Sequence, residues 1–362
     1  MTNSPRRRPI RTVHLLGGLR AYDVPRQGVE VGQNHLIDFS FKDVEYATLY
    51  KVLESLGLIP IGVSFIEMRE QISGVHPADF EMVSPEGFSA MKARREWSNI
   101  AASAVRTTLD SDVESLARRI STYLRLSSWR LMQVSEAYYR TCYEPRAEAA
   151  KSGEIPAGGF ENQWTWELQT TIHGFLADVA TLRDVLAEAV WKLVVKDDQH
   201  DVLTMGSLMK KAKSHESPFV QSFIALGEEG GWLGNLTDLR NETTHVVPVN
   251  GFHEQFLCFL RGIPVQGGRK IAQMHCPLTT DSWGLRRDAD RNVDWKDDKK
   301  ARASIDRYRA YVSTSGDALE YCWRTVRNLA EWAEKLRLEA GLKADTPIIT
   351  DADLANATIV MD

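Results

Sequence analysis

An apolar stripe of helical period runs through the middle of the chain and constrains its fold more than any other feature. Its members recur every three or four residues over about six turns: Ile172, Phe175, Leu176, Val179, Leu182, Val185, Leu186, Ala189, Val190 and Leu193. A helix of this length needs neighbouring helices to cover its apolar face. The stripe therefore predicts a mainly α protein built as a helical bundle.

Further helical patterns lie on both sides of the stripe. One begins at residue 111 with the capping box SDVE, and shorter ones are expected at 203–213, at 217–227 and from Trp232 to about His245. The segment 217–227 opens with Ser-Pro and stops at a glycine, which are typical helix boundaries. The period returns between residues 305 and 336, and Gly341 ends it.

Three segments break this helical period. Residues 1–90 are expected to form a small α+β region, with strands at 35–41 and 59–68 and one helix between them. Residues 145–159 (PRAEAAKSGEIPAGG) are rich in Pro, Gly and small polar residues, so a loop is expected. Residues 255–261 and 270–275 indicate a β-hairpin inserted into the helical part.

These patterns divide the 362 residues into three parts. The α+β region covers 1–90, the helical domain covers 91–345 with its insertion at about 250–298, and 346–362 form a tail. A length of this size fits two ordinary domains, since about 100–200 residues per domain is usual.

Charge and cysteine content limit the partners and the compartment. The formal net charge is −5, so an RNA contact must come from a local basic patch, and the basic run PRRRPIR at 5–11 is expected to be a solvated tail. The cysteines are far apart and form no Cys-x-x-Cys pair: Cys142, Cys258, Cys276 and Cys322. Together with the lack of a long apolar segment, this indicates a soluble cytoplasmic protein with no membrane partner.

The segment Arg240-Asn241-Glu242-Thr243-Thr244-His245 is the candidate site. Arginine carries a permanent planar cation that suits phosphate oxygens, and histidine exchanges protons near neutral pH. Spacing alone does not identify a site, because Arg69 and His76, and likewise Arg269 and His275, are separated by similar distances in the sequence. The asparagine after Arg240, the apolar residue before it and its place near a helix end set this segment apart.

These residues resemble the signature of the HEPN superfamily, in which an Arg, often followed by Asn, Asp or His, precedes a His by four to six residues. The resemblance extends from about residue 100 to 342. It implies a metal-independent endoribonuclease without a cofactor, in which the 2′-hydroxyl of RNA attacks its own phosphate and leaves a cyclic phosphate. It also implies a toxin or phage-defence effector, with an antitoxin or another regulatory protein as a further partner.

By this resemblance His245 moves the proton, Arg240 neutralises charge on the phosphate, and Asn241 positions Arg240 or the phosphate. Residues five apart on a regular helix differ by about 140° in direction. The pair therefore converges within one chain only if the helix end unwinds; otherwise two copies in a homodimer supply a composite site. A non-catalytic HEPN-like module that binds RNA or a protein, and a plain helical scaffold, are the alternatives.

Several other polar residues are expected to be structural. Glu167, Asp178 and Asp184 lie on the long helix and are expected to be solvated surface carboxylates or to pair with the neighbouring Arg183, while His173 lies beside the apolar stripe. The hairpin contains side chains that zinc accepts, but they lack paired ligand spacing, so no metal is expected: His253, Cys258, His275 and Cys276.

Overall fold

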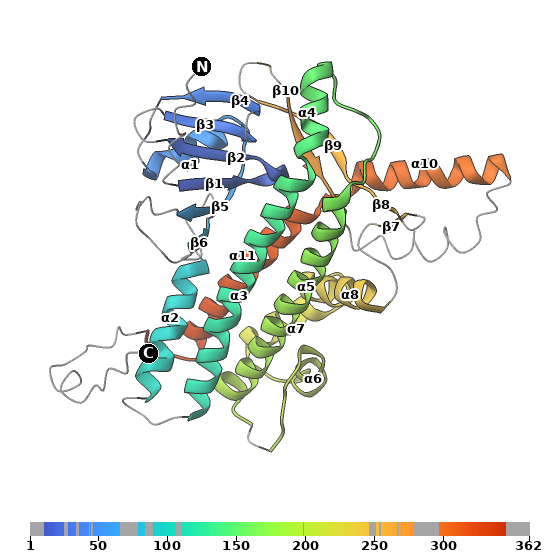
Figure 1. The fold of residues 1–362 in the computed structure, drawn as a ribbon. Helices are drawn as coiled ribbons and strands as arrows, with labels where there is room; N and C mark the ends of the chain where they lie inside the picture. The colour runs from blue at the N-terminus through green and yellow to red at the C-terminus, as the bar shows by residue number, and fades with distance from the viewer. Residues whose placement is uncertain are drawn as a thin grey trace, which may run out of the picture.

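The computed structural model describes residues 11–24, 28–33, 36–42, 44, 46–65, 79–83, 90–105, 111–197, 199–245, 251–252, 255–265, 268, 270–278 and 297–344. Within these residues the protein is predominantly helical, as predicted, but it also contains a six-stranded sheet. Figure 1 shows the long helices running together along one diagonal, with the sheet at one end of them. Helix α3 (Ser111–Thr141) packs against α2 (Ala90–Ser103), α5 (Gln163–Val190) and α11 (Ala318–Glu339).

Helix α5 contains the long apolar stripe and confirms it. Asn162 caps the helix by accepting a hydrogen bond from the Trp164 amide at 3.0 Å. The stripe residues from Ile172 to Val190 are buried against the neighbouring helices. A short π-helical segment, Trp191–Val195, follows, and Lys196 ends it in the left-handed conformation.

The shorter helices also begin and end near the predicted residues. Helix α6 covers Met205–Lys211, α7 covers Pro218–Gly227 and α8 covers Trp232–His245. The Ser217 hydroxyl caps α7, with Pro218 in the first turn. None of the helices in the described part of the chain combines the length and apolar composition that crossing a bilayer requires.

The N-terminal sheet is larger than the sequence indicated. Its antiparallel strands follow the order β4-β3-β2-β1-β5-β6: β1 Arg11–Leu15, β2 Arg20–Val24, β3 Gly28–Gln33, β4 Leu36–Phe41, β5 Pro60–Phe65 and β6 Asp79–Met82. Strands β4 and β5 and helix α1 (Tyr46–Ser55) were expected, whereas the other four strands were not. Those strands are four to six residues long, and whether such a short segment forms a strand depends on the partners against which its side chains pack.

The predicted hairpin is present, with β9 (Phe259–Pro264) paired to β10 (Lys270–His275). Shorter strands flank it, namely β7 (Gly251–Phe252), β8 (Gln255–Phe256) and β11 (Pro277–Leu278). Strand β11 pairs with β12 (Gly316–Asp317), which separates α10 (Asp298–Thr314) from α11. The helical period expected from 305 to 336 is therefore broken near Gly316.

The loop predicted at 145–159 is wrong over its first half, where α4 (Tyr143–Ser152) forms. Proline is tolerated in a first helical turn, and the alanines that follow favour a helix. Arg146 and Ala149 are buried and give this helix an inner side. The small and polar residues of the segment do not reveal that side from the sequence alone.

Polar side chains join the sheet to α3 and α4. The buried ring of His14 contacts the Ser135 hydroxyl of α3 at 2.9 Å and the Ser64 hydroxyl of β5 at 2.8 Å. Burial, followed by the charge of Arg20, holds the pKa of His14 well below its usual value, so the ring is neutral at pH 7. This contact places β1 against the C-terminal part of α3.

Arg146 makes the most connected of these contacts. Its guanidinium pairs with Asp38 of β4 at 2.7 Å and donates to the Gln33 side chain at 3.0 Å and to the Ala272 carbonyl of β10 at 2.9 Å. One buried cation therefore links the sheet, α4 and the hairpin.

We predict that Arg146→Met lowers the free energy of unfolding by about 3–5 kcal/mol, because it leaves Asp38 and two further acceptors without their donor in a buried site. Urea denaturation measures the change. Arg118→Met is the matched control, since Arg118 is exposed and its one ion pair among the described residues is with Glu114 one turn away, so its loss should change stability only slightly. Equal effects of the two substitutions would contradict the prediction.

Candidate functional site

Helix α8 carries the candidate site and is anchored by one apolar side. Leu233, Leu236 and Leu239 are buried, and the helix packs against α5 and α7. Because these leucines recur every three residues, they fix which side of α8 faces the bundle. Thr243 near the helix end is also buried, whereas Asp238 is exposed.

Arg240 follows Leu236 by four residues, so it lies toward the side of α8 that the leucines define, whereas Asn241 points away from that side. Arg240 is half-buried and Asn241 is exposed. The Arg240 guanidinium donates from Nη1 to Oδ1 of Asn241 at 3.2 Å. The Thr243 hydroxyl donates to the Arg240 carbonyl at 3.0 Å, which secures the last turn of the helix. Asn241 thus provides a hydrogen-bond acceptor for the arginine beside it.

His245 is the final residue of α8, and its backbone remains helical. Its side chain is outside the part of the chain that the structure describes. Since the helix does not unwind between Arg240 and His245, the two positions point about 140° apart around the axis. Arg240 and His245 can converge either by local unwinding of the helix or by pairing with a second copy of the chain. The backbone shows no local unwinding.

The carboxylates of α5 are engaged elsewhere. Glu167 pairs with Arg140 at 2.6 Å, and Asp178 pairs with Arg130 at 2.6 Å. These bridges join α5 to α3 along their length. Both acids therefore pair with arginines of α3, and neither pairs with Arg183 as the sequence suggested.

Asp184 and Arg183 form a junction between three helices. Both Nε and Nη2 of Arg183 contact Oδ1 of Asp184, at 3.0 and 2.9 Å, and the same oxygen accepts a hydrogen bond from the Met205 amide of α6 at 3.0 Å. Nη1 of Arg183 donates to the hydroxyl of Thr237 on α8. The pairing of Arg183 with Asp184 was foreseen, but its contact with α8 was not.

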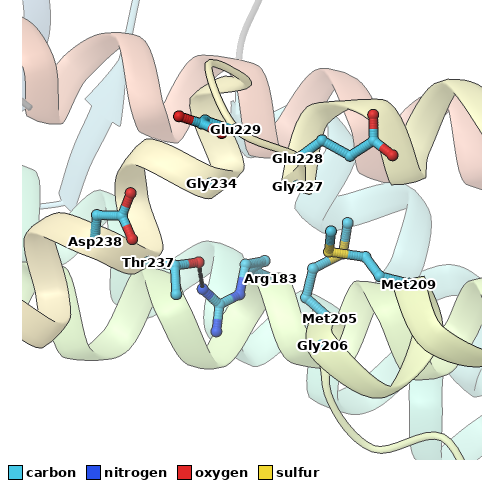
Figure 2. Close-up of a pocket in the computed structure, with 10 residues that line it drawn as sticks. All are labelled: Arg183, Met205, Gly206, Met209, Gly227, Glu228, Glu229, Gly234, Thr237 and Asp238. Atoms are coloured by element: carbon cyan, nitrogen blue, oxygen red, sulfur yellow. Dashed lines mark hydrogen bonds between the residues drawn. The ribbon is translucent and has the colours of Figure 1, made fainter.

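This junction forms the wall of a cavity of about 300 Å³ one turn before Arg240. Figure 2 shows the Arg183 side chain pointing toward Thr237, with two methionine side chains beside it and three carboxylates from α8 and the loop before it. The cavity is lined by Arg183, Met205, Gly206, Met209, Gly227, Glu228, Glu229, Gly234, Thr237 and Asp238. The glycines of the run GEEGGWLG were the one sequence signal of close packing here.

A second group of polar residues lies buried where the hairpin meets α11. Asp317 accepts hydrogen bonds from the Tyr138 hydroxyl at 3.0 Å and from the Cys276 amide at 3.1 Å. Burial raises the pKa of Asp317 to about 6. Tyr138 is fully buried, and its pKa is raised first by burial and then by the charge of Asp317. The group is sealed inside the protein and has the character of a structural network.

His275 belongs to this interior and is not an exposed acid or base. Its Nε2 contacts the Ser315 hydroxyl at 3.2 Å. Its Nδ1 lies 3.7 Å from Asp317, which favours a charged ring, but burial and the nearby Arg261 outweigh this and lower its pKa to about 3. Arg69, His76 and Arg269 lie outside the described residues.

The other candidate ligands are placed as follows. His173 is half-buried on α5, and burial lowers its pKa. Cys258 and Cys276 are buried at the two ends of the hairpin strands, and His253 lies outside the described residues. Among the residues that the structure describes, no three His, Cys, Asp or Glu side chains are placed to hold a metal ion.

Comparison with known proteins gives no relative: the chain matches no protein-family model and no curated protein, and its fold matches no solved structure. The role of α8 is therefore argued from its own residues.

Two glycines of the cavity beside α8 should respond oppositely to alanine. A Cβ on Gly206 has no atom within 4 Å, so Gly206→Ala should raise the free energy of unfolding by about 0.5 kcal/mol through better helix propensity. A Cβ on Gly234 would lie 2.5 Å from the Glu228 carbonyl oxygen, so Gly234→Ala should lower it. Urea denaturation compares the two, and the same sign for both would refute this geometry.

Proposed function

We propose that the protein is a metal-independent endoribonuclease of the HEPN type, with a HEPN-like helical bundle as its catalytic part. The observation that carries the proposal is that Arg240, Asn241 and His245 occupy the final turns of one helix, where the half-buried Arg240 donates a hydrogen bond to the exposed Asn241. A cation near a proton carrier is the combination that phosphodiester cleavage requires.

In the proposed reaction the 2′-hydroxyl of RNA attacks the adjacent phosphorus, and the bond from that phosphorus to the 5′-oxygen breaks. His245 moves a proton between the hydroxyl and the leaving oxygen. Arg240 stabilises the charge that develops on the phosphate oxygens, and the 3.2 Å contact with Asn241 positions its guanidinium. The products are a 2′,3′-cyclic phosphate and a 5′-hydroxyl end.

The regular end of α8 supports a site shared by two copies of the chain. Because Arg240 and His245 diverge by about 140° on their helix, an Arg240 and a His245 from different copies are needed to meet at one phosphate. A two-fold symmetric dimer brings two such helix ends together. We propose a cytoplasmic toxin or defence effector as the setting, controlled by an antitoxin or another regulatory protein.

The central test replaces each catalytic residue. Arg240→Ala and His245→Ala should each reduce RNA cleavage by about 10²–10⁴-fold, the usual contribution of one acid–base group. Arg240→Lys should also fail, because an ammonium group does not reproduce a two-pronged contact with phosphate. Gel analysis of mixed RNAs with and without EDTA measures the activity, and EDTA should have no effect.

Arg118→Ala and His200→Ala are the controls, since both side chains are exposed and lie outside α8. They should cleave like the parent protein. Cleavage that EDTA stops, or that survives His245→Ala, would refute the mechanism. RNA binding without any cleavage would favour a non-catalytic binding module.

The shared site predicts a homodimer in solution at micromolar concentration. Light scattering should give about twice the mass of one chain. A mixture of Arg240→Ala and His245→Ala proteins should recover part of the activity, because a mixed dimer keeps one intact composite site. A strict monomer that cleaves RNA would show instead that one chain supplies the whole site.

A further inference from the structure

Helix α10 concentrates positive charge on a protein that is negative overall. Its 17 residues, DKKARASIDRYRAYVST, contain five Lys or Arg and two Asp, whereas the whole chain has a net charge of −5. Four of the basic side chains are exposed: Lys299, Lys300, Arg302 and Arg307. They extend over about 12 Å of the helix axis.

These cations have few carboxylate partners. Lys300 lies 3.7 Å from Asp297, but Lys299, Arg302 and Arg307 pair with no carboxylate among the described residues. Five arginines of the long helices are instead neutralised by acids at 4 Å or less: Arg118, Arg119, Arg130, Arg140 and Arg324. The positive charge of α10 is therefore open to an outside anion.

The helix is fixed at its C-terminal end. The Tyr308 ring packs on Phe259 of β9 with 6.4 Å between ring centroids, and Arg261 of β9 donates a hydrogen bond to the Val312 carbonyl. In Figure 1, α10 extends from this end away from the long helices. These contacts fix the C-terminal end of α10 on the hairpin, so the basic side chains are presented on an anchored helix.

We propose that α10 binds the phosphate backbone of single-stranded RNA, an inference that rests on the proposed function for its choice of ligand. A chain of phosphates matches several lysines and arginines spaced along a helix, and the contacts need no base recognition. An anionic membrane fits less well, because insertion needs a broad apolar face. Among the described side chains of α10, Ile305 is the one large apolar group that is exposed, and small residues such as Ala303 and Ala310 lie beside the cations.

The test measures RNA affinity by fluorescence anisotropy in the full-length Arg240→Ala protein, which prevents cleavage. The α10 variant combines Lys299→Gln, Lys300→Gln, Arg302→Gln and Arg307→Gln. We expect roughly 100-fold weaker binding at low salt, and a slope of log affinity against log salt that falls by about 0.7 for each phosphate that α10 no longer neutralises. Circular dichroism should show an unchanged fold, since glutamine is a good helix former.

A matched variant removes four other exposed cations from α2, α3 and α11 and gives the same change in net charge: Arg95→Gln, Arg118→Gln, Arg125→Gln and Arg324→Gln. It should bind RNA nearly as tightly as the parent. Equal loss of affinity in both variants, an unchanged affinity in the α10 variant, or no RNA binding by the parent would overturn the inference. So would α10-dependent binding to phosphatidylserine vesicles in place of RNA.

Cleavage by the protein with native Arg240 separates this inference from the proposed function. RNA binding that depends on α10, without cleavage by that protein, would support the role of α10 and refute the ribonuclease. Suppose instead that cleavage needs His245, but the α10 substitutions change neither the cleavage rate nor the RNA affinity. That result would support the ribonuclease and refute the role of α10.

Discussion

The side chain of Asp317 is the contact on which the arrangement of the helical body depends. It caps α11 by accepting from the Leu319 and Glu320 amides, and it also receives the Tyr138 hydroxyl of α3 and the Cys276 amide beside the hairpin. One carboxylate therefore sets where α11 begins, how it lies against α3 and where the hairpin ends. Burial raises its pKa to about 6. The four donors compensate part of the cost of a buried charge near neutral pH, when the group is mostly ionised.

A second set of polar contacts fixes the sheet on this body. Apolar burial forms two clusters, and the larger one joins Ile61 and Met82 of the sheet to the helices, but burial of this kind is not directional. Directional contacts between the sheet and the helices come from three polar pairs: His14 with Ser135, Arg20 with Glu136, and Arg146 with Asp38. These pairs fix one position of the sheet on the helices, because any shift would leave buried polar groups without hydrogen-bond partners.

The sequence predicted those elements whose signals are local. Helix α5 follows from its stripe, α7 from Ser217 and Pro218, and α8 from its residues up to His245. Strands β1 to β3 and helix α4 were missed because their buried sides are covered by partners distant in the sequence, as with Arg146 and Asp38. The candidate site was predictable as a motif, but the contact of Arg183 with Thr237, which links α5 to α8, depends on tertiary packing.

In the proposed ribonuclease, catalysis and RNA capture would be carried by two different helices, α8 and α10. Chemistry would depend on the last turn of α8, whose direction is set by Leu233, Leu236 and Leu239 packing against the bundle. Capture of RNA would depend on charges on another element, joined to the body through Phe259 and Tyr308. Because the protein is negative overall, attraction to RNA would be confined to the neighbourhood of α10 and screened beyond about 10 Å at ordinary salt. Salt would then weaken substrate capture more than the chemical step, since Arg240 and His245 act at contact distance on a phosphate already bound.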